Sequence, residues 1–207
     1  MKKERTRSQI ARGARNKGSS AERTVAKLLG LCFFGDEEFF HRSPASGGLR
    51  WKKNVGGTRG DIVAPEEIGW PFSIEIKNTE KGGWDLFQVL FNHGPILKEW
   101  WEQAQTDADE VNVGSKKYVH PWLIFKRNQV PFLMVMGESC FLNTLPVVDK
   151  LYLPMGSYFH LPEQGLYIMP LSAFLLSNLK YKVEELLDKN PDLIKRHLIN
   201  PMKGIAE

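Results

Sequence analysis

Three residues whose side chains could act together chemically stand close to one another in the first half of the chain. Asp61 follows Gly60, and the stretch "FSIEIKN" that begins at Phe72 carries Glu75 and Lys77 two residues apart. Because side chains alternate between the two faces of a strand, this stretch sends Glu75 and Lys77 to one face and its Phe and Ile residues to the other. The sequence predicts two adjacent strands that bring an aspartate, a glutamate and a lysine to one end of a sheet.

The chemistry that this trio fits is hydrolysis of a phosphodiester. Neighbouring carboxylates repel each other unless a cation lies between them. Asp61 and Glu75 offer only oxygen ligands, which favour Mg²⁺ or Mn²⁺ over zinc. Such an ion polarises a phosphoryl oxygen and lowers the pKa of a bound water, while Lys77 orients that water or stabilises charge on the phosphate. The alternative is an ordinary exposed sheet face, since such short combinations also arise by chance.

The surrounding segments predict the elements that position these residues. Apolar residues at helical spacing predict helices over about residues 19–31 and 98–111. Residues 43–60 are rich in Gly, Ser and Pro, which is typical of a loop, and residues 120–137 read as two strands joined by a polar turn. Beyond residue 137, "KLYLP" and "GLYIMP" read as short strands, and "LSAFLLSNL" and "KVEELLDKNPDLIKRHLI" as helices. With a short strand near residues 39–42, the order before these additions is helix, strand, strand, strand, helix, strand. This order indicates an α/β fold with a mixed β-sheet flanked by helices.

Positive charge is concentrated near the N-terminus and in the loop that precedes Asp61. Residues 1–27 hold nine Lys and Arg against two Glu, in a chain whose net charge is +4. A basic N-terminal arm and a basic loop favour a polyanionic partner, most simply nucleic acid. A solvated tail would have the same composition as the arm. Trp51, set among basic residues, is a candidate to stack on a base or wedge into a branch point, or else to anchor the loop. The candidate DNA-binding residues are Arg12, Arg15, Lys17, Arg42, Arg50, Trp51, Lys52, Lys53 and Arg59.

Length and composition exclude several other classes of protein. The 207 residues, 42% of them hydrophobic, suit one domain with additions. No apolar run reaches the roughly 18 residues of a membrane span, and no apolar stretch follows the basic N-terminus as in a signal peptide. Cys32 and Cys140 are far apart, and the five histidines lack metal-ligand spacing, so neither a disulfide framework nor a zinc site is expected. We therefore expect a cytoplasmic protein of a bacterial, archaeal or phage-infected cell, with no membrane partner.

Five segments, in order, resemble the PD-(D/E)xK nuclease superfamily, and within it the archaeal-type and phage-type Holliday junction resolvases. They are Glu22-Arg23 in the first helix, "HRSPASGG" from His41, Gly60-Asp61, "IEIK" from Ile74 and "WWEQA" from Trp100. The resemblance spans roughly residues 17–137. Gly60-Asp61 stands where many members have Pro-Asp, and residues 80–99 and those after about 138 lie outside the pattern.

The resemblance implies a role for each matching residue. Asp61 and Glu75 would ligate the metal together with the Ile76 carbonyl, and Lys77 would be the catalytic lysine. Glu22 would help to hold the metal or its water, although Ser19-x-x-Glu22 also fits a capping box that merely begins the helix. The residues expected to approach or position the scissile phosphate are Arg42, Ser46 and Gln103, with Gln105 a rival to Gln103.

These observations predict a restriction-endonuclease-like α/β domain with additions. We expect a basic flexible arm over residues 1–17, a nuclease core over 18–137 with an insert at about 80–99, and a C-terminal extension over 138–207 packed on the core. The implied activity is Mg²⁺-dependent or Mn²⁺-dependent endonuclease action on DNA in recombination or repair, with four-way junctions as substrate and a homodimer as the active form. The alternatives are a nuclease of the same superfamily with a repair, restriction or end-processing substrate, and a non-catalytic DNA-binding protein.

Overall fold

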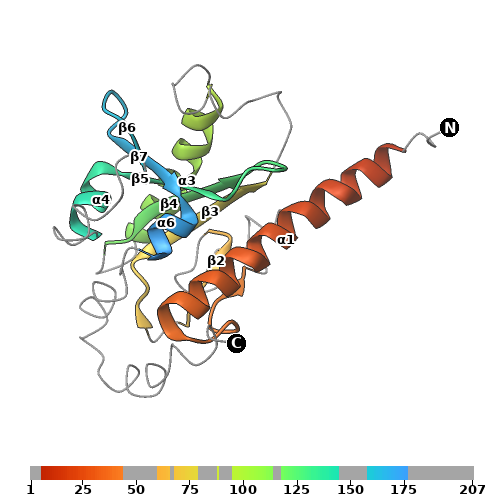
Figure 1. Ribbon diagram of the computed structural model, residues 1–207, viewed down its shortest axis with the longest axis horizontal. Coiled ribbons are helices and arrows are strands. Elements are labelled where there is room, and N and C mark those ends of the chain that lie inside the picture. The colour runs from red at the N-terminus through yellow and green to blue at the C-terminus, as the bar shows by residue number, and fades with distance from the viewer. Residues whose placement is uncertain are drawn as a thin grey trace.

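The computed structural model describes residues 6–43, 60–65, 68–78, 88, 95–113, 118–144 and 158–176 (Figure 1). The elements run in the order α1 (Arg7–Phe34), β1 (His41–Arg42), β2 (Ile62–Val63), β3 (Phe72–Asn78), α3 (Ile96–Asn112), β4 (His120–Lys126), β5 (Leu133–Gly137), α4 (Glu138–Thr144), β6 (Phe159–Leu161), β7 (Leu166–Pro170) and α6 (Leu171–Leu176). Within these described ranges, none of the helices combines the length and the apolar character that crossing a membrane requires.

The main sheet has five strands in the order β3-β4-β5-β7-β6. β3 and β4 are parallel and joined through α3, whereas the pairs β4–β5, β5–β7 and β6–β7 are antiparallel. β3 forms one edge of this sheet. The result is the α/β fold with a mixed sheet flanked by helices that the sequence predicted, and it has the restriction-endonuclease-like arrangement.

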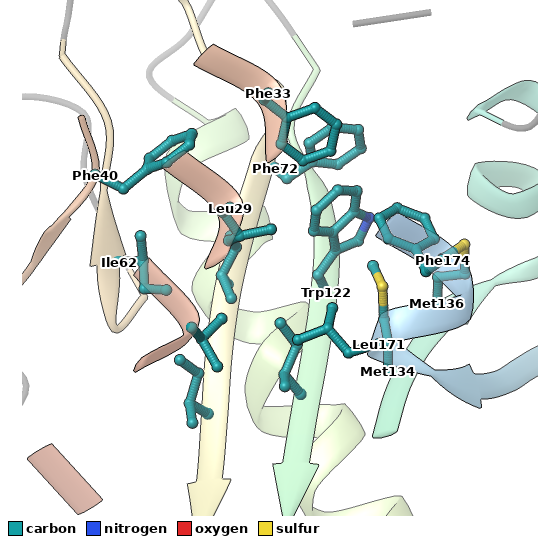
Figure 2. Packing of buried hydrophobic residues seen from close by; sticks show 14 of the residues in the cluster. Leu29, Phe33, Phe40, Ile62, Phe72, Trp122, Met134, Met136, Leu171 and Phe174 are labelled. Carbon is teal, nitrogen blue, oxygen red and sulfur yellow. The ribbon is translucent and has the colours of Figure 1, made fainter. Parts of the chain in front are cut away.

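Hydrophobic side chains cover both faces of the sheet. On one face, Ile74, Ile76 and Trp122 pack with α1 and α6 in an aromatic-rich cluster (Figure 2). On the other face, Leu123 and Phe125 pack against α3. Figure 2 shows the indole nitrogen of Trp122 directed at the ring of Phe174, whose centroid is 5.0 Å from that of Trp122 in an edge-on arrangement. The alternation fixes which face each strand residue occupies, and so sends Glu75 and Lys77 towards α3.

Helix α1 is longer than the sequence pattern predicted. It begins at Arg7 rather than near residue 19 and ends at Phe34, followed by Gly35 with φ 68°. Residues 7–17, expected as part of a flexible arm, thus continue the same helix, and Figure 1 shows this end of α1 extending away from the sheet. The capping-box interpretation of Glu22 was wrong, because Ser19 and Glu22 lie in the middle of the helix, where there is no helix start to cap.

The chain after residue 137 contributes to the same sheet. The predicted strand in "GLYIMP" is β7, the predicted helix in "LSAFLL" is α6, and both lie against β5. β6 and α4 were not expected. The expected strand at "KLYLP" and the last expected helix fall outside the described residues. Most of the insert at 80–99 does so too, although α3 already begins within it, at Ile96.

β2 does not pair with β3 as the sequence suggested. It pairs with β1 in a separate two-stranded sheet, with His41 opposite Val63. Asp61 lies directly before β2 and reaches β3 through its own backbone, because its N–H donates to the Ile74 carbonyl at 2.7 Å. The prediction that the strand after Asp61 pairs with β3 was therefore wrong. The strands of the small sheet, β1 and β2, are each only two residues long.

Gly60 is required for this close approach. Its φ is 98°, and a Cβ built on it would lie 2.7 Å from the Ile74 carbonyl oxygen and 2.9 Å from the Ile74 nitrogen. We expect Gly60→Ala to lower the free energy of unfolding by about 2–4 kcal/mol, because the β3 backbone cannot move away without disturbing the sheet. Thermal and urea unfolding measure this loss.

Two other glycines provide matched controls for that variant. Gly165 also has a positive φ of 60°, but a Cβ added there would meet no atom within 4 Å. We therefore expect Gly165→Ala to lower the free energy of unfolding only by the cost of its backbone conformation, about 1 kcal/mol. Gly13 lies in α1 with equally open surroundings, so Gly13→Ala should be neutral or stabilising. Equal losses at Gly60 and Gly165 would contradict the role of the close contact with Ile74.

Candidate active site

Asp61 is held at the open edge of β3 by backbone contacts on both sides. Its carbonyl accepts the Ser43 N–H at 2.8 Å, and its carboxylate Oδ2 accepts the Ile76 N–H at 2.7 Å. In a strand the N–H and C=O of one residue point to the same side, so the Ile76 carbonyl faces this edge as well. This geometry brings together the two groups, the Asp61 carboxylate and the Ile76 carbonyl, that the sequence comparison implied as metal ligands.

Glu75, Lys77 and Gln103 form a closed hydrogen-bonded triangle. Lys77 Nζ donates to Glu75 Oε1 at 2.6 Å and to Gln103 Oε1 at 2.7 Å, and Gln103 Nε2 donates to Glu75 Oε1 at 2.9 Å. Glu75 is buried, with 7% of its surface exposed, although it carries a formal charge. Such a charge is tolerated in the interior when a cation and further hydrogen bonds satisfy it. The triangle therefore fixes the lysine and the carboxylate relative to each other.

Gln103 comes from α3, the helix that connects β3 to β4 and packs on the face of the sheet to which Glu75 and Lys77 point. Gln103 faces the sheet on α3 while Gln105 is exposed, so the structure resolves the choice between these two glutamines in favour of Gln103 as the residue beside Lys77.

The carboxyl group of Asp61 lies in surroundings that disfavour its charge. Burial raises its pKa to about 7, and the nearby charges of Glu75 and Glu22 contribute to this rise, against the lowering effects of the Ile76 N–H and Lys77. Burial is the largest of these effects, and the repulsion from the two glutamates adds to it. A cation bound there would relieve this repulsion.

Glu22 is buried on α1 and pairs with Arg42 of β1. The Arg42 Nε donates to Glu22 Oε2, and Glu22 is only 7% exposed. Arg42, expected to approach a phosphate, thus lies at the site in contact with this carboxylate. The charge of Glu22 acts on Asp61, which places α1 near the edge of β3 where the other two acids lie.

The oxygen groups at the edge of β3 suit a magnesium-like ion better than a metal that is surrounded by protein ligands alone. Among the described residues, no three His, Cys, Asp or Glu side chains come close enough together to hold a metal ion. Asp61, Glu75 and the Ile76 carbonyl supply oxygen ligands only, and Mg²⁺ commonly uses one or two carboxylates, completing its shell with water and substrate phosphate. Asp61 and Glu75 therefore fit as ligands, whereas the role implied for Glu22 as a third ligand stays a prediction.

Several predicted residues lie outside the part of the chain that the structure describes. They are Ser46, Arg50, Trp51, Lys52, Lys53 and Arg59, all in the segment 44–59. Arg12 and Arg15 lie on α1, and their side chains are likewise outside the described part. Lys17 is half-buried on α1. The roles of these residues in binding DNA remain predictions.

One residue at the site was missed in the sequence. Asn78 directly follows Lys77, and its Nδ2 donates to the Lys17 carbonyl of α1 at 3.1 Å. This bond ties the end of β3 to the turn of α1 that lies just before Glu22. Its only signal in the sequence was its position next to the lysine.

Gln103 provides a test of the triangle. We expect Gln103→Ala to lower the single-turnover rate of DNA cleavage about 10-fold to 100-fold, because Lys77 and Glu75 each lose a partner that fixes their orientation. Gln105→Ala, which removes the same side chain from the exposed face of that helix, should retain the wild-type rate. Equal rates for the two variants would exclude a positioning role for Gln103.

A comparison with known protein families identifies the chain. The family described as phage putative PDDEXK endonuclease matches residues 13–153. The chain belongs to this family. The matched range contains the whole cluster formed by Glu22, Asp61, Glu75, Lys77 and Gln103, and so supports the PD-(D/E)xK nuclease superfamily that the motifs resembled. No curated protein and no solved structure matches the chain.

PD-(D/E)xK nucleases generally use divalent metal ions, in agreement with the oxygen-only ligands at the edge of β3. The family match does not extend to a particular DNA substrate.

Proposed function

We propose that this PD-(D/E)xK protein is a Mg²⁺-dependent endonuclease that hydrolyses phosphodiester bonds in DNA, with Mn²⁺ able to replace Mg²⁺. The observation that carries the proposal is the arrangement of Asp61 beside the triangle of Glu75, Lys77 and Gln103 at the edge strand of the sheet.

Each residue of the site has a separate task in this reaction. Asp61 and Glu75, with the Ile76 carbonyl, would hold the divalent ion, which would neutralise phosphate charge and acidify a water. Lys77 donates two of its three N–H groups to Glu75 and Gln103, so a third N–H remains to donate to a water or a phosphate oxygen. Lys77 then stabilises the charge that develops on the phosphate as the bond breaks, and Gln103 keeps it in position.

The favoured substrate is a branched DNA such as a four-way junction. This choice rests on the five segments that resemble junction resolvases in composition and order, and on the basic residues of the arm and loop, which suit phosphate contacts rather than base reading. A junction has two-fold symmetry, so a homodimer with two equivalent sites would make paired incisions. Binding should weaken steeply with salt.

The test is Mg²⁺-dependent cleavage by the full chain of a labelled four-way junction, beside linear duplex, single-stranded and flap DNA of matched length. Paired, symmetric incision of the junction, with a dimeric mass by sedimentation, supports the resolvase proposal. Cleavage of one of the other substrates in preference would keep the nuclease and discard the junction. DNA binding without metal-dependent cleavage of any substrate would overturn the proposal in favour of a non-catalytic DNA-binding protein.

A further inference from the structure

We infer that the turn between β4 and β5, residues 126–131, is a further DNA-contacting surface that binds backbone phosphates beside the catalytic end of β3. This inference rests on the proposed nuclease function and adds contacts from a part of the chain that the sequence pattern did not suggest. It follows from the register of the sheet, the charge of the turn and one unusual backbone conformation.

The register brings the turn close to the catalytic lysine. β3 and β4 are parallel, with Lys77 opposite Phe125 and Asn78 opposite Lys126. Neighbouring strands lie about 5 Å apart, so Lys126 is separated from Lys77 by one strand spacing and one residue. The turn then continues beyond the last residue of β3. The side chain of Lys77 points to the α3 face and that of Lys126 to the α1 face, so DNA with its scissile phosphate at Lys77 would reach the turn around the end of β3.

Lys126 lies on the face of the sheet that α1 covers. Trp122 and Ile124 belong to the cluster on that face, and alternation along β4 gives Lys126 the same orientation. Its Nζ lies 4.7 Å from the centroid of the Phe132 ring, a contact that supports the side chain. On the same face, Asn78 Nδ2 holds the Lys17 carbonyl. Asn78 thus contacts the backbone of Lys17 through its side chain and pairs with Lys126 in the sheet.

The composition of the turn suits phosphate oxygens. Residues 126–131 are Lys, Arg, Asn, Gln, Val and Pro, which give two cations and two amides with no acid. Arginine, lysine, asparagine and glutamine are common partners of DNA phosphates. The exposed face of α3, on the other side of the sheet, carries the opposite charge through Glu99, Glu102, Asp109 and Glu110. This asymmetry favours a DNA path along the strand ends and the turn rather than over the exposed face of α3.

The backbone of the turn holds a polar residue where glycine would fit more easily. Gln129 has φ 63° and is the one non-glycine residue with a positive φ among those the structure describes. The Val130 N–H donates to the Arg127 carbonyl at 3.2 Å and closes the turn around it. Such a position favours glycine, and a glutamine is less stable there because its Cβ crowds the backbone. An exposed amide kept at a strained position is consistent with a ligand contact.

The test is the salt dependence of DNA binding, measured by fluorescence anisotropy in EDTA so that the DNA stays intact. We expect Lys126→Gln/Arg127→Gln to reduce the slope of log K against log salt by about 2, because two phosphate contacts are lost. Lys27→Gln is the matched control, since Lys27 pairs with Glu37 and lies ten residues, about 15 Å, along α1 from Lys17. It should retain the wild-type slope.

Gln129→Gly separates binding from folding. We expect it to unfold at the same temperature as the wild type or higher, while its DNA affinity falls about threefold or more. Cleavage at saturating DNA should stay within about twofold of wild type in every turn variant, because the turn holds DNA beside the reacting phosphate.

The outcomes distinguish the inference from the proposed function. A wild type that cuts DNA, with turn variants that keep its salt slope and affinity, would overturn the inference alone. A loss of rate at saturating DNA without a change in slope would also overturn it. A wild type that neither binds nor cuts DNA would remove the proposed function, and this inference with it.

Discussion

Replacing Lys77 with methionine should lower the single-turnover rate of DNA cleavage about 10³-fold while changing DNA affinity less than about threefold. Methionine keeps much of the apolar stem but has no donor for the phosphate. The side chain of Lys77 is held by Glu75 at 2.6 Å and by Gln103 at 2.7 Å, so its position is defined before DNA binds. Its loss therefore acts on the chemical step, where a preorganised donor has its effect.

Two further variants make this result specific to the site. Lys77→Arg keeps the positive charge, but its planar guanidinium cannot reproduce both contacts of the compact ammonium, and we expect it to recover little activity. Lys98→Met removes an exposed lysine of α3 whose Nζ lies 3.8 Å from Glu102, and it should cut DNA like the wild type. If Lys77→Met retains a tenth or more of the wild-type rate, Lys77 is not the catalytic lysine.

Replacing Asp61 with asparagine should abolish cleavage and at the same time stabilise the metal-free protein at pH 8. The asparagine side-chain oxygen can still accept the Ile76 N–H, so the local geometry is preserved. The substitution removes a buried negative charge that lies near Glu75 and Glu22. We expect the free energy of unfolding in EDTA to rise by on the order of 2–4 kcal/mol, or roughly 5–10 °C in the unfolding midpoint.

The pH dependence of this gain has a definite sign. The pKa of Asp61 is raised from 3.8 to about 7 in the folded chain, so between these values the folded state holds a proton that the unfolded state has lost. The contribution of Asp61 to the stability of the wild type therefore falls as pH rises from about 4 to about 7 and changes no further above that range. Asp61→Asn has no carboxyl group at this position and does not lose this stability. Its free energy of unfolding should therefore exceed that of the wild type by a large margin at pH 8 and a small one at pH 5.

Thermal unfolding of both proteins across pH 5–8, with and without Mg²⁺, measures these effects. Mg²⁺ should stabilise the wild type most at pH 8, since it competes with the proton for the Asp61 carboxylate, and should stabilise Asp61→Asn much less. An advantage of Asp61→Asn that is equal at pH 5 and pH 8 would show that the charge of Asp61 is not disfavoured in the folded state.

The common face of Glu75 and Lys77 could be predicted from the sequence because it follows from local periodicity alone. The two-residue period of "FSIEIKN" was enough to give Glu75 and Lys77 a common face, and the hydrogen bond between them agrees with it. Neither the spacing nor the helical pattern distinguished Gln103 from Gln105. That choice depends on how α3 is rotated against the sheet, which only the packing of both elements determines.

The parts that sequence reasoning missed depend on contacts between distant segments. The start of α1 at Arg7 was hidden because the glycines and serines before Ala21 are typical of helix ends, and Ala21 is the first buried residue among the side chains that the structure describes. β1 and β2 are each two residues long, too short for a pattern to assign their partners. β7 lies between β5 and β6, an order that no local signal encodes.

The most direct test of the site is the Mg²⁺-dependent cleavage rate of wild type, Glu75→Gln and Glu102→Gln on the same labelled DNA. Glutamine keeps an acceptor for Lys77 but removes the charge that we propose holds the metal, whereas Glu102 is an exposed carboxylate next to Gln103 in the sequence. We expect Glu102→Gln to match the wild type, Glu75→Gln to cut at least about 10³-fold more slowly, and EDTA to stop all three. Cleavage by Glu75→Gln at the wild-type rate would contradict the assignment of this cluster as the active site.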